Sequence, residues 1–392
     1  MTSTTRYDVI LKIVHLIFRP LFAAMYGLKY EKFSLGKDRP CLVLCNHQSF
    51  WDPVFVSTVY DRPIHFMATD NIFTDGLVSK LLKYFLAPIP KKKQVVDLKA
   101  IKMTMQIAKA NGVVGIFPEG SCSYDGNGTS VVPGVAQLAR KIKADIALCN
   151  LEGAYGTIPR WGNKKRKGII RCFNRKYITY EESASMTEAE LSSEISESLV
   201  VKAPPYDVKY RSEKRAEYLE RCVYICPSCG RKNTLVSSGN IIRCSTCGLE
   251  SEYREDCTIR FNRDLGITTL AEWLALQKKQ AEELFRNDPD ECLFEDRVAK
   301  IASYKSSEDD RIRYGEGLIR LSRDGIHLLP DSGEVIYISA DAVKAISPVS
   351  GIKLMIGLSD ITYFLVGNER FNPYKYAQML NFIQGCGEKE IK

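Results

Sequence analysis

Two matched cysteine pairs constrain the fold of this chain more tightly than any other feature. Cys226 and Cys229 form one C-x2-C pair, Cys244 and Cys247 form the other, and 14 residues separate the two pairs. Four thiolates satisfy a tetrahedral zinc ion and leave no coordination position open. We therefore expect a structural Zn2+ site here, with an iron–sulfur cluster and a redox dithiol as the alternatives.

The residues around these pairs predict a zinc ribbon over residues 206–265. Residues 237–240, with the sequence Ser-Ser-Gly-Asn, have the composition of a hairpin turn. Cys222 and Cys257 flank the site and complicate the assignment of its ligands. We expect the ribbon to serve as a rigid spacer or docking platform rather than to bind nucleic acid.

Length, charge and total cysteine content set broader limits. A chain of 392 residues is long enough for two to four folded units. Its 13 cysteines are odd in number and irregularly spaced, which does not predict a disulfide framework and favours a reducing, cytosolic compartment. The formal net charge of +8 favours an anionic partner: nucleic acid, a membrane surface or a phosphorylated substrate.

Residues 9–30 are hydrophobic but do not form an uninterrupted membrane span. Polar or charged side chains interrupt the stretch at Lys12, His15, Arg19 and Lys29. Pro20 would also kink a helix at this point. The pattern predicts amphipathic helices that lie on a membrane surface, and a helix packed into the protein core is the alternative.

Strand and helix patterns alternate over residues 1–205. Residues 41–45 and 113–117 are short apolar runs that predict buried strands, and residues 99–110 and 135–142 have helical periodicity. This alternation predicts an α/β domain with a mixed sheet flanked by helices. An acidic surface helix over residues 186–201 and the sequence Ala-Pro-Pro after it mark the end of the domain.

The last third of the chain predicts a different architecture. Residues 269–285 have the capping spacing and apolar positions of a helix, within an expected helical connector over residues 266–305. Beyond it, short strand patterns separated by turn residues occupy residues 317–321, 325–329, 335–338 and 361–366, and a helix pattern occupies residues 373–384. We expect residues 306–392 to form a β-rich, pleckstrin-homology-like domain with a C-terminal helix.

A histidine and an aspartate follow the first buried strand. His47 and Asp52 are five residues apart, a spacing that would turn them about 140° apart on a straight helix. They can meet only if the segment is a turn that enters a helix. Histidine can accept a proton from a hydroxyl at neutral pH, and a carboxylate on its other ring nitrogen fixes the tautomer. The pair predicts general-base chemistry, with a chance pair in a turn as the alternative.

A second polar loop follows the other buried strand. Residues 117–126 have the sequence Phe-Pro-Glu-Gly-Ser-Cys-Ser-Tyr-Asp-Gly, which combines a carboxylate, hydroxyls and two glycines. Gly120 and Gly126 permit tight turns, and backbone N–H groups in such turns can bind oxyanions.

At these two places the chain resembles the glycerophospholipid acyltransferase superfamily, in its lysophosphatidic acid acyltransferase (PlsC-like) branch. The family block N-H-x4-D is matched by Asn46, His47 and Asp52. Its block F-P-E-G-T-R-S is matched by Phe117, Pro118, Glu119, Gly120 and Ser123. The resemblance covers about residues 10–200.

The resemblance implies an enzyme that moves a fatty acyl group from acyl-CoA or acyl-carrier protein to a lysophospholipid hydroxyl in phospholipid biosynthesis, with 1-acyl-glycerol-3-phosphate as the expected acceptor. His47 would be the base and Asp52 its partner, in a direct transfer with no acyl-enzyme. The enzyme would work at the cytoplasmic face of the membrane as a peripheral or monotopic protein that contacts anionic lipids. The expected substrate-binding residues are Asn46, Ser49, Lys91, Lys92, Lys93, Phe117, Pro118, Glu119, Gly120, Ser121 and Ser123.

Two departures from the family pattern leave the acceptor open. Ser121 and Cys122 stand where the family usually has threonine and arginine, and an arginine fork is a natural phosphate ligand. Residues 91–93, three lysines, stand where the family has an arginine in its second block. The acceptor is therefore lysophosphatidic acid held by lysines, or a lysolipid that needs no arginine clamp.

Residues 153–167 offer further candidate lipid contacts. Arg160 could meet an anionic group and Trp161 could lie at a headgroup interface, with a surface loop as the alternative. Residues 164–167 form a basic run, Lys-Lys-Arg-Lys, which we expect to touch anionic headgroups. As a whole-chain alternative, the acyltransferase fold is degenerate, and the zinc ribbon and C-terminal domain bind a lipid or protein. Nucleic acid is not an expected partner.

Overall fold

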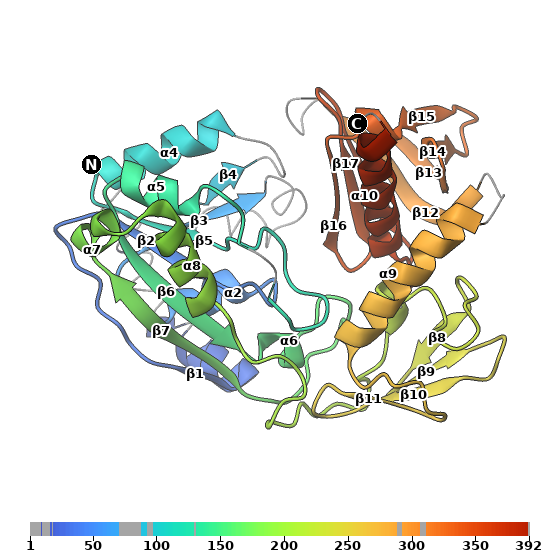
Figure 1. Ribbon diagram of the computed structural model, residues 1–392, viewed down its shortest axis with the longest axis horizontal. Helices are drawn as coiled ribbons and strands as arrows, with labels where there is room; N and C mark the ends of the chain where they lie inside the picture. Colours follow the sequence, from blue (N-terminus) through green and yellow to red (C-terminus); the bar gives the residue numbers. More distant parts are fainter. Residues whose placement is uncertain are drawn as a thin grey trace. The chain divides into compact units, whose positions relative to one another are not determined.

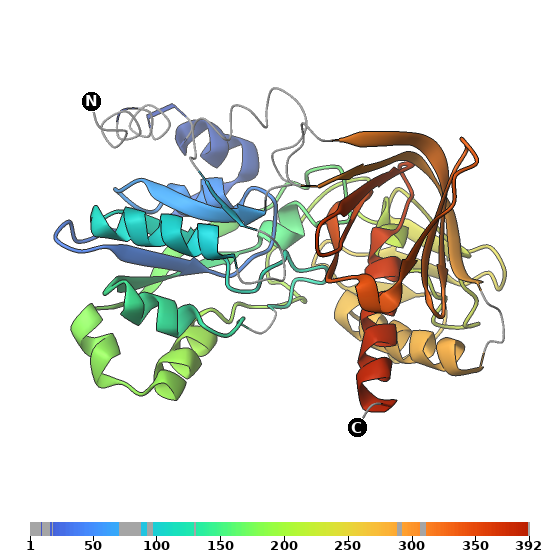
Figure 2. The same cartoon turned by 90° about the horizontal axis from the view of Figure 1, so that it is seen from above.

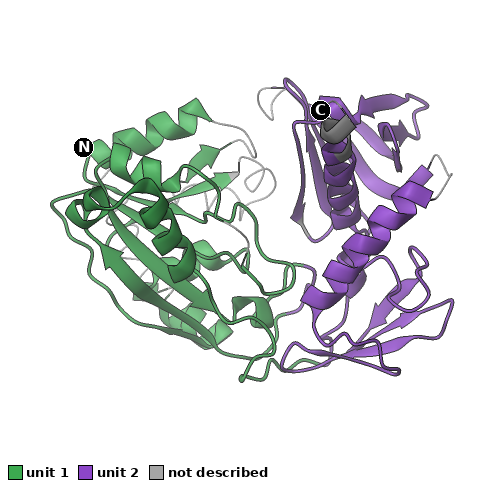
Figure 3. Cartoon of the chain, viewed as in Figure 1, with its two compact units in different colours: residues 1–160, 165–212 green, residues 161–164, 213–392 purple. Residues whose placement is uncertain are grey.

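The chain divides into two compact units. The computed structural model describes residues 9, 16–17, 19–69, 88–91, 97–128, 131–287, 292–305 and 311–390. The first unit comprises residues 1–160 and 165–212, and the second comprises residues 161–164 and 213–392 (Figure 3).

A mixed seven-stranded sheet organises the first unit (Figure 1). Its strands are β1 (Leu28–Tyr30), β2 (Cys41–Cys45), β3 (Ile64–Thr69), β4 (Ile89–Lys91), β5 (Val113–Ile116), β6 (Asp145–Glu152) and β7 (Ile170–Ile178). They lie in the order β1-β7-β6-β2-β5-β3-β4, and every neighbouring pair is parallel except β6 and β7. The expected mixed α/β sheet is therefore confirmed.

Helices cover both faces of this sheet, which explains why β2 is apolar throughout. Cys41 and Val43 contribute to one core with residues of α2 (Asp52–Ser57). Leu42 and Leu44 contribute to the other core, which includes side chains from α4 (Leu98–Lys109), α5 (Val135–Lys141) and α8 (Glu188–Ser198). A strand buried on both faces has no polar alternation. Two shorter helices, α6 (Ala154–Thr157) and α7 (Tyr180–Ser185), complete the unit.

The first unit continues beyond the Pro-Pro sequence expected to end it. Tyr210 is 2% exposed, and its ring lies where a Cβ on Gly153, Gly156 or Gly168 would clash. Arg211 also exchanges two backbone hydrogen bonds with Lys167, both 2.8 Å long. These contacts hold residues 206–212 on the first unit, so the boundary lies at 212 rather than 205.

The expected membrane-docking segment, residues 9–30, lies partly outside the described residues. Within the described part, residues 19–26 are helical. Leu16, Ile17, Leu21 and Met25 are exposed. None of the helices in the described part of the chain has the length and apolar character needed to cross a bilayer.

The second unit begins with a short 3-10 helix, η2 (Leu219–Arg221), and a small antiparallel sheet. Its strands are β8 (Leu235–Ser238), β9 (Ile241–Cys244), β10 (Glu250–Tyr253) and β11 (Ile259–Phe261), in the order β11-β10-β9-β8. Ser238 pairs with Ile241, and Gly239 between them has a φ of +59°. The hairpin turn expected at residues 237–240 is therefore present.

A second seven-stranded sheet, antiparallel throughout, forms the rest of this unit (Figure 2). Its strands are β12 (Cys292–Tyr304), β13 (Ile312–Ser322), β14 (Gly325–Pro330), β15 (Ile336–Ser339), β16 (Ala345–Ser350), β17 (Lys353–Gly357) and β18 (Thr362–Gly367), in the order β15-β14-β13-β12-β18-β17-β16. Helix α9 (Leu270–Asn287) precedes the sheet, the 3-10 helix η4 (Ala340–Ala342) follows β15, and helix α10 (Pro373–Glu390) ends the unit.

The expectation of a helical connector over residues 266–305 is wrong for its second half. Residues 292–304 form β12, which pairs with both β13 and β18 at the centre of the sheet. Register shifts between Val298 and Ile301 show that β12 is irregular there. Such a bulge breaks the period-two alternation by which a strand is found in a sequence.

One hydrophobic core joins the parts of the second unit. Tyr224 and Ile225 lie directly before the first cysteine pair, and they pack in the same core as Ala281 of α9, the sheet and α10. Gln277 of α9 also binds the backbone N–H of Tyr224 at 2.7 Å. The segment that leads into the first cysteine pair thus shares a core with the larger sheet, although the two sheets are separate.

Candidate active site

His47 and Asp52 meet in the turn between β2 and α2. Helix α2 begins at Asp52, so the five-residue segment reverses instead of continuing as a helix. His47 Nδ1 lies 2.8 Å from Asp52 Oδ2. The Asp52 side chain is fully buried, whereas that of His47 retains 19% exposure. The carboxylate is therefore shielded from solvent, and the imidazole can still be reached.

Asp52 is held by its own turn. Its Oδ2 accepts the backbone N–H of Gln48 at 2.6 Å and that of Ser49 at 2.9 Å. The hydroxyl of Ser49 donates to Oδ1. Three donors besides the imidazole thus hold this carboxylate in place. In the neutral form of His47 we assign the imidazole proton to Nδ1, which leaves Nε2 as the proton acceptor.

The second polar loop holds the backbone of His47 from both sides. Glu119 Oε1 accepts the N–H of His47 at 3.0 Å, and the N–H of Ser123 donates to the His47 carbonyl at 2.9 Å. The two loops meet because β2 and β5 are parallel and in register, with Leu44 paired to Ile116. The carboxyl ends of both strands therefore lie at one edge of the sheet.

Aromatic rings fix the plane of the imidazole. Phe117 stacks on His47 with ring centroids 4.2 Å apart and an interplanar angle of 19°. Phe66 of β3 stacks in turn on Phe117 at 5.5 Å. Phe117 therefore orients the histidine.

Cys122 lies beside the imidazole. Its Sγ is 3.2 Å from His47 Nε2 and 3.6 Å from Nδ1. Burial lowers the pKa of His47, but the charge of Cys122 and hydrogen bonds from Asp52 and Cys122 act in the opposite direction and raise that pKa to about 10. The thiol is thus part of the electrostatic environment of the candidate base.

Arg160 approaches the same loop from a distant part of the sequence. Its Nη1 donates to the Cys122 carbonyl at 3.0 Å, and its guanidinium carbon lies 4.5 Å from the centroid of the Tyr124 ring. A guanidinium group therefore lies close to the position at which the family motif has arginine, although residue 122 is a cysteine.

The other expected substrate-binding residues differ in burial and in their distance from the loop of His47. Asn46 is buried and forms two 2.8 Å hydrogen bonds with the backbone of Leu151, so its amide joins β2 to β6. Gly120 is exposed, with a φ of +71° and open space where a Cβ would project. Pro118 is buried and Ser121 is partly buried. Lys91 ends β4, whereas residues 92–93 lie outside the described residues.

Two side chains proposed to face lipid are buried. Trp161 is 1% exposed and packs edge-on against Tyr253 within the second unit, with ring centroids 5.3 Å apart. Arg166, inside the expected basic run, is 2% exposed and donates to the Gly156 carbonyl. Both expectations are therefore wrong for these residues, because Trp161 is covered by a distant segment and Arg166 is folded back onto the backbone of α6. Lys164, Lys165 and Lys167 are exposed.

The first unit is similar to a known protein family and to several characterised proteins. Residues 29–151 match the family model described as Acyltransferase. A chloroplastic 1-acyl-sn-glycerol-3-phosphate acyltransferase of Brassica napus is 26% identical over 167 residues, which are 42% of this chain and 48% of that protein. The 1-acyl-sn-glycerol-3-phosphate acyltransferase of Bacillus subtilis (strain 168) is 28% identical over 97 residues, which are 24% of this chain and 48% of that protein.

The first unit carries a glycerophospholipid acyltransferase domain. A chloroplastic 1-acyl-sn-glycerol-3-phosphate acyltransferase of Arabidopsis thaliana is also similar, with 25% identity over 169 residues, 42% of this chain and 46% of that protein. The chain spans a little under half the length of these relatives. The crystal structure of the 1-acyl-sn-glycerophosphate acyltransferase PlsC from Thermotoga maritima aligns with a TM-score of 0.42 and 21% identity, covering 51% of this chain and 80% of that one.

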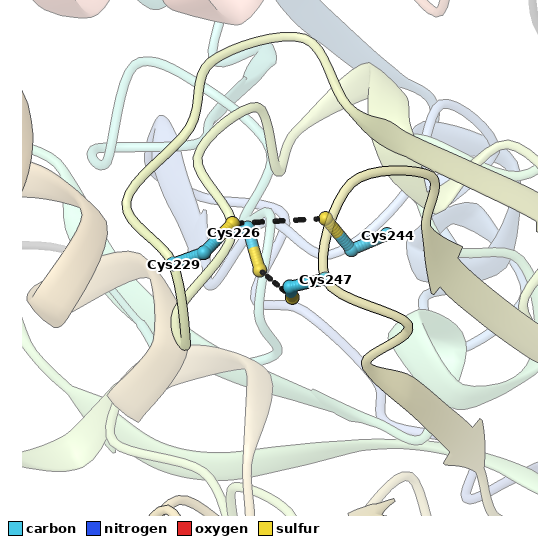
Figure 4. Close-up of side chains that lie close together, drawn as sticks. All are labelled: Cys226, Cys229, Cys244 and Cys247. Carbon is cyan, nitrogen blue, oxygen red and sulfur yellow. Dashed lines mark hydrogen bonds between the residues drawn. The ribbon is translucent and has the colours of Figure 1, made fainter.

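Beyond the acyltransferase domain, the four paired cysteines form one cluster (Figure 4). Their sulfur atoms all lie within 4.8 Å of one another, with 3.7 Å between Cys226 and Cys247 and 3.8 Å between Cys229 and Cys244. Cys222 and Cys257 are buried outside the cluster. Residues 219–250 match a zinc-ribbon model described as the 7 kDa subunit of DNA-directed RNA polymerase.

Three residues of the acyltransferase site were not identified from the sequence. Gln48 supplies a backbone donor to Asp52, Cys122 lies beside the imidazole, and Phe66 stacks on Phe117. Gln48 follows His47 directly, and a turn around Asp52 brings its N–H to the carboxylate. In the sequence, Cys122 is distinguished only by standing where the family has arginine, and no local signal marks Phe66.

Proposed function

We propose that the acyltransferase domain transfers a fatty acyl group from acyl-CoA or acyl-carrier protein to a lysophospholipid hydroxyl, with 1-acyl-glycerol-3-phosphate as the acceptor. The observation that carries this proposal is the 2.8 Å hydrogen bond between His47 and Asp52, in a turn held on both sides by the second loop. The three relatives, each a 1-acyl-sn-glycerol-3-phosphate acyltransferase by name, support the choice of acceptor.

In this proposal His47 accepts the proton that the acceptor hydroxyl loses when its oxygen attacks the acyl carbonyl. Asp52 keeps the Nδ1 proton in place and stabilises the imidazolium that forms. Glu119 orients the base by binding its backbone N–H and is not a second base.

Arg160 is our candidate ligand for the acceptor phosphate. Its guanidinium lies against the loop that contains Cys122, and a planar fork can bind two phosphate oxygens. The lysines at residues 91–93 remain candidates for additional charge. Replacement of Arg160 by alanine should raise the KM for lysophosphatidic acid more than that for a zwitterionic lysophospholipid, and Arg160→Lys should recover part of the loss.

The cysteine cluster suits a structural zinc ion. Tetrahedral Zn–S bonds of about 2.3 Å place the sulfur atoms roughly 3.8 Å apart, which agrees with the two distances in the cluster. The strand order of the C-terminal sheet, closed by α10, supports a pleckstrin-homology-like fold for that part.

We place the enzyme at the cytoplasmic face of a membrane as a peripheral or monotopic protein. Ile17, Leu21 and Met25 are exposed and spaced four residues apart, which puts them on one face of a helix. Lys165 lies nearby, with its Nζ 5.0 Å from the centroid of the Tyr26 ring. A positive charge beside exposed apolar side chains favours anionic lipids.

The test is CoA release from acyl-CoA by the purified chain on liposomes that contain phosphatidylglycerol. The acceptors are lysophosphatidic acid and several other lysophospholipids, and His47→Ala is the control. The second donor is acylated acyl-carrier protein, for which release of the carrier-protein thiol is measured in place of CoA. Release that requires an acceptor and falls by roughly 100-fold or more in the variant supports the proposal. If no acceptor stimulates release from either donor, the acyltransferase fold is a degenerate binding module and the proposal is wrong.

A further inference from the structure

Cys122 extends the pair of His47 and Asp52 to a chain of three side chains, and direct transfer makes no use of its thiol. Asp52 Oδ2 lies 2.8 Å from His47 Nδ1, and Cys122 Sγ lies 3.2 Å from His47 Nε2. A thiol, an imidazole and a buried carboxylate in this order are the parts of a nucleophilic triad. The thiol comes from a loop 75 residues away in the sequence.

The surroundings allow the thiol to react. Cys122 is partly buried, whereas Cys45, Cys149 and Cys172 of the same unit are at most 1% exposed. The Nδ1 of His47 is occupied by Asp52, so Nε2 is the nitrogen that can take the thiol proton. The sulfur is at similar distances from both nitrogens and therefore lies beside the ring. Catalytic hydrogen bonds are often poorly aligned in the free enzyme and tighten only when substrate binds.

We infer that Cys122 accepts the acyl group covalently, so that transfer proceeds through an S-acyl-Cys122 intermediate instead of direct attack on the donor. This inference rests on the proposed function, because it specifies the route by which the same site transfers the acyl group.

Each half-reaction balances without a further reagent. His47 takes the thiol proton as Cys122 Sγ attacks the donor carbonyl; the C–S bond to CoA breaks, and the CoA thiolate recovers the proton from His47. The acceptor hydroxyl then attacks the S-acyl carbon and gives its proton to His47. The C–S bond to Cys122 breaks, and the thiolate is reprotonated. The first step exchanges one thioester for another, and the second forms an oxygen ester.

The electrostatics of His47 depend on Cys122. Among the effects that raise the pKa of His47, the charge of Cys122 is the largest, and burial opposes it. Acylation converts the sulfur to an uncharged thioester and removes this effect. The pKa of His47 then falls, so more of the imidazole is in the neutral form that accepts the proton of the acceptor hydroxyl.

The intermediate can be located on a single peptide. Trypsin cleaves after Lys109 and Arg140 and at no position between them, and Cys122 is the only cysteine in residues 110–140. The full chain is incubated with palmitoyl-CoA without acceptor, quenched in acid and digested. We expect this peptide to gain one palmitoyl group that neutral hydroxylamine removes.

Variants test whether the adduct is catalytic. Cys122→Ala keeps the backbone carbonyl that binds Arg160, so it removes the thiol without removing that contact. It should abolish the adduct and reduce acceptor-dependent CoA release to the level of His47→Ala. In His47→Ala the adduct should form roughly 100-fold or more slowly. Cys292→Ser, a partly buried cysteine in the second unit, is the matched control and should leave the adduct and its rate unchanged.

The outcomes separate this inference from the proposed function. Addition of lysophosphatidic acid should discharge the adduct into phosphatidic acid, with parallel lines in two-substrate kinetics. Normal acceptor-dependent release without an adduct, or full release by Cys122→Ala, overturns the inference and leaves the proposed function standing. An adduct that discharges only to water supports the covalent step and overturns the proposed acceptor. Absence of both the adduct and acceptor-dependent release contradicts both.

Discussion

Asp52 is the residue on which the geometry of the candidate site depends. It binds His47 while three further donors hold its two oxygens. Because these bonds define the turn, Asp52 controls both the position and the tautomer of the imidazole. Its neighbour Ser49 contributes only part of that network.

Asp52→Asn should therefore reduce kcat by roughly 1,000- to 10,000-fold, the scale seen when a triad histidine is left in the wrong tautomer. Ser49→Ala is the matched comparison, because two backbone donors still hold the carboxylate, and it should cost about tenfold. The measurement is kcat for acceptor-dependent CoA release. Equal losses of kcat in the two variants would show that kcat depends on the shape of the turn and not on the Asp52 carboxylate.

The titration of His47 provides a second test at the residue scale. The pKa of this imidazole is raised to about 10, so its protonated form should persist well above neutral pH in the free enzyme. Cys122→Ala removes a charge and a hydrogen bond that favour the protonated form, so the pKa should fall. The chain has only four histidines, and 13C-labelled histidine with His47→Gln for assignment can resolve the signal. An unchanged titration in Cys122→Ala would contradict the contact between the two side chains.

At the scale of elements, the packing of Tyr210 explains how residues 206–212 are held on the first unit. A Cβ on Gly156, which lies in α6, would be 2.5 Å from the Tyr210 ring, and Gly153 and Gly168 are equally crowded by the same side chain. Three glycines thus provide the space for one tyrosine, which attaches residues 206–212 to α6 and to the segment before β7.

Gly156→Ala should lower the free energy of unfolding of the first unit by about 1–3 kcal/mol, because the added methyl overlaps a fully packed ring. Gly36→Ala is the control, since the nearest atom to its Cβ would be at an ordinary 3.6 Å. Scanning calorimetry should show a lower midpoint for the first variant and a shift within error for the second. A normal midpoint for Gly156→Ala would mean that Tyr210 does not occupy this position.

At the scale of the whole molecule, the second unit should depend on its cysteine cluster. Trp273 is fully buried and donates to the carbonyl of Ile225, the residue before Cys226, at 3.3 Å. Trp161 packs against Tyr253 of β10. Both tryptophans of this unit therefore report on the ribbon, and the shared core extends any local change to the larger sheet.

We expect about one zinc ion per chain, bound by the four cysteines. A strong chelator or Cys226→Ser should remove the metal and shift tryptophan emission to longer wavelength, because binding and folding of such sites are coupled. Cys292→Ser should retain the metal and the emission spectrum. Metal analysis that finds no zinc, or zinc removal without a spectral change, would contradict a structural role for the ion.

Local sequence patterns were enough to predict several parts of the molecule. The apolar run over residues 41–45 matches β2 because a strand buried on both faces must be apolar throughout. The four cysteines come together as expected because their spacing already suits tetrahedral coordination. The turn that joins His47 to Asp52 was predictable because no straight helix brings together residues five apart.

Contacts between distant segments could not be predicted, because they depend on strand register and packing. Cys122 lies beside His47 because β2 and β5 are parallel and in register, and no property of residue 122 predicts that pairing. Arg160 and Trp161 are adjacent in sequence, yet one lies against the candidate site and the other is buried in the second unit. The irregular pairing of β12 interrupts the period-two pattern by which a strand is recognised in a sequence. Local patterns indicate which chemistry a chain can carry, but strand register and packing decide which side chains meet.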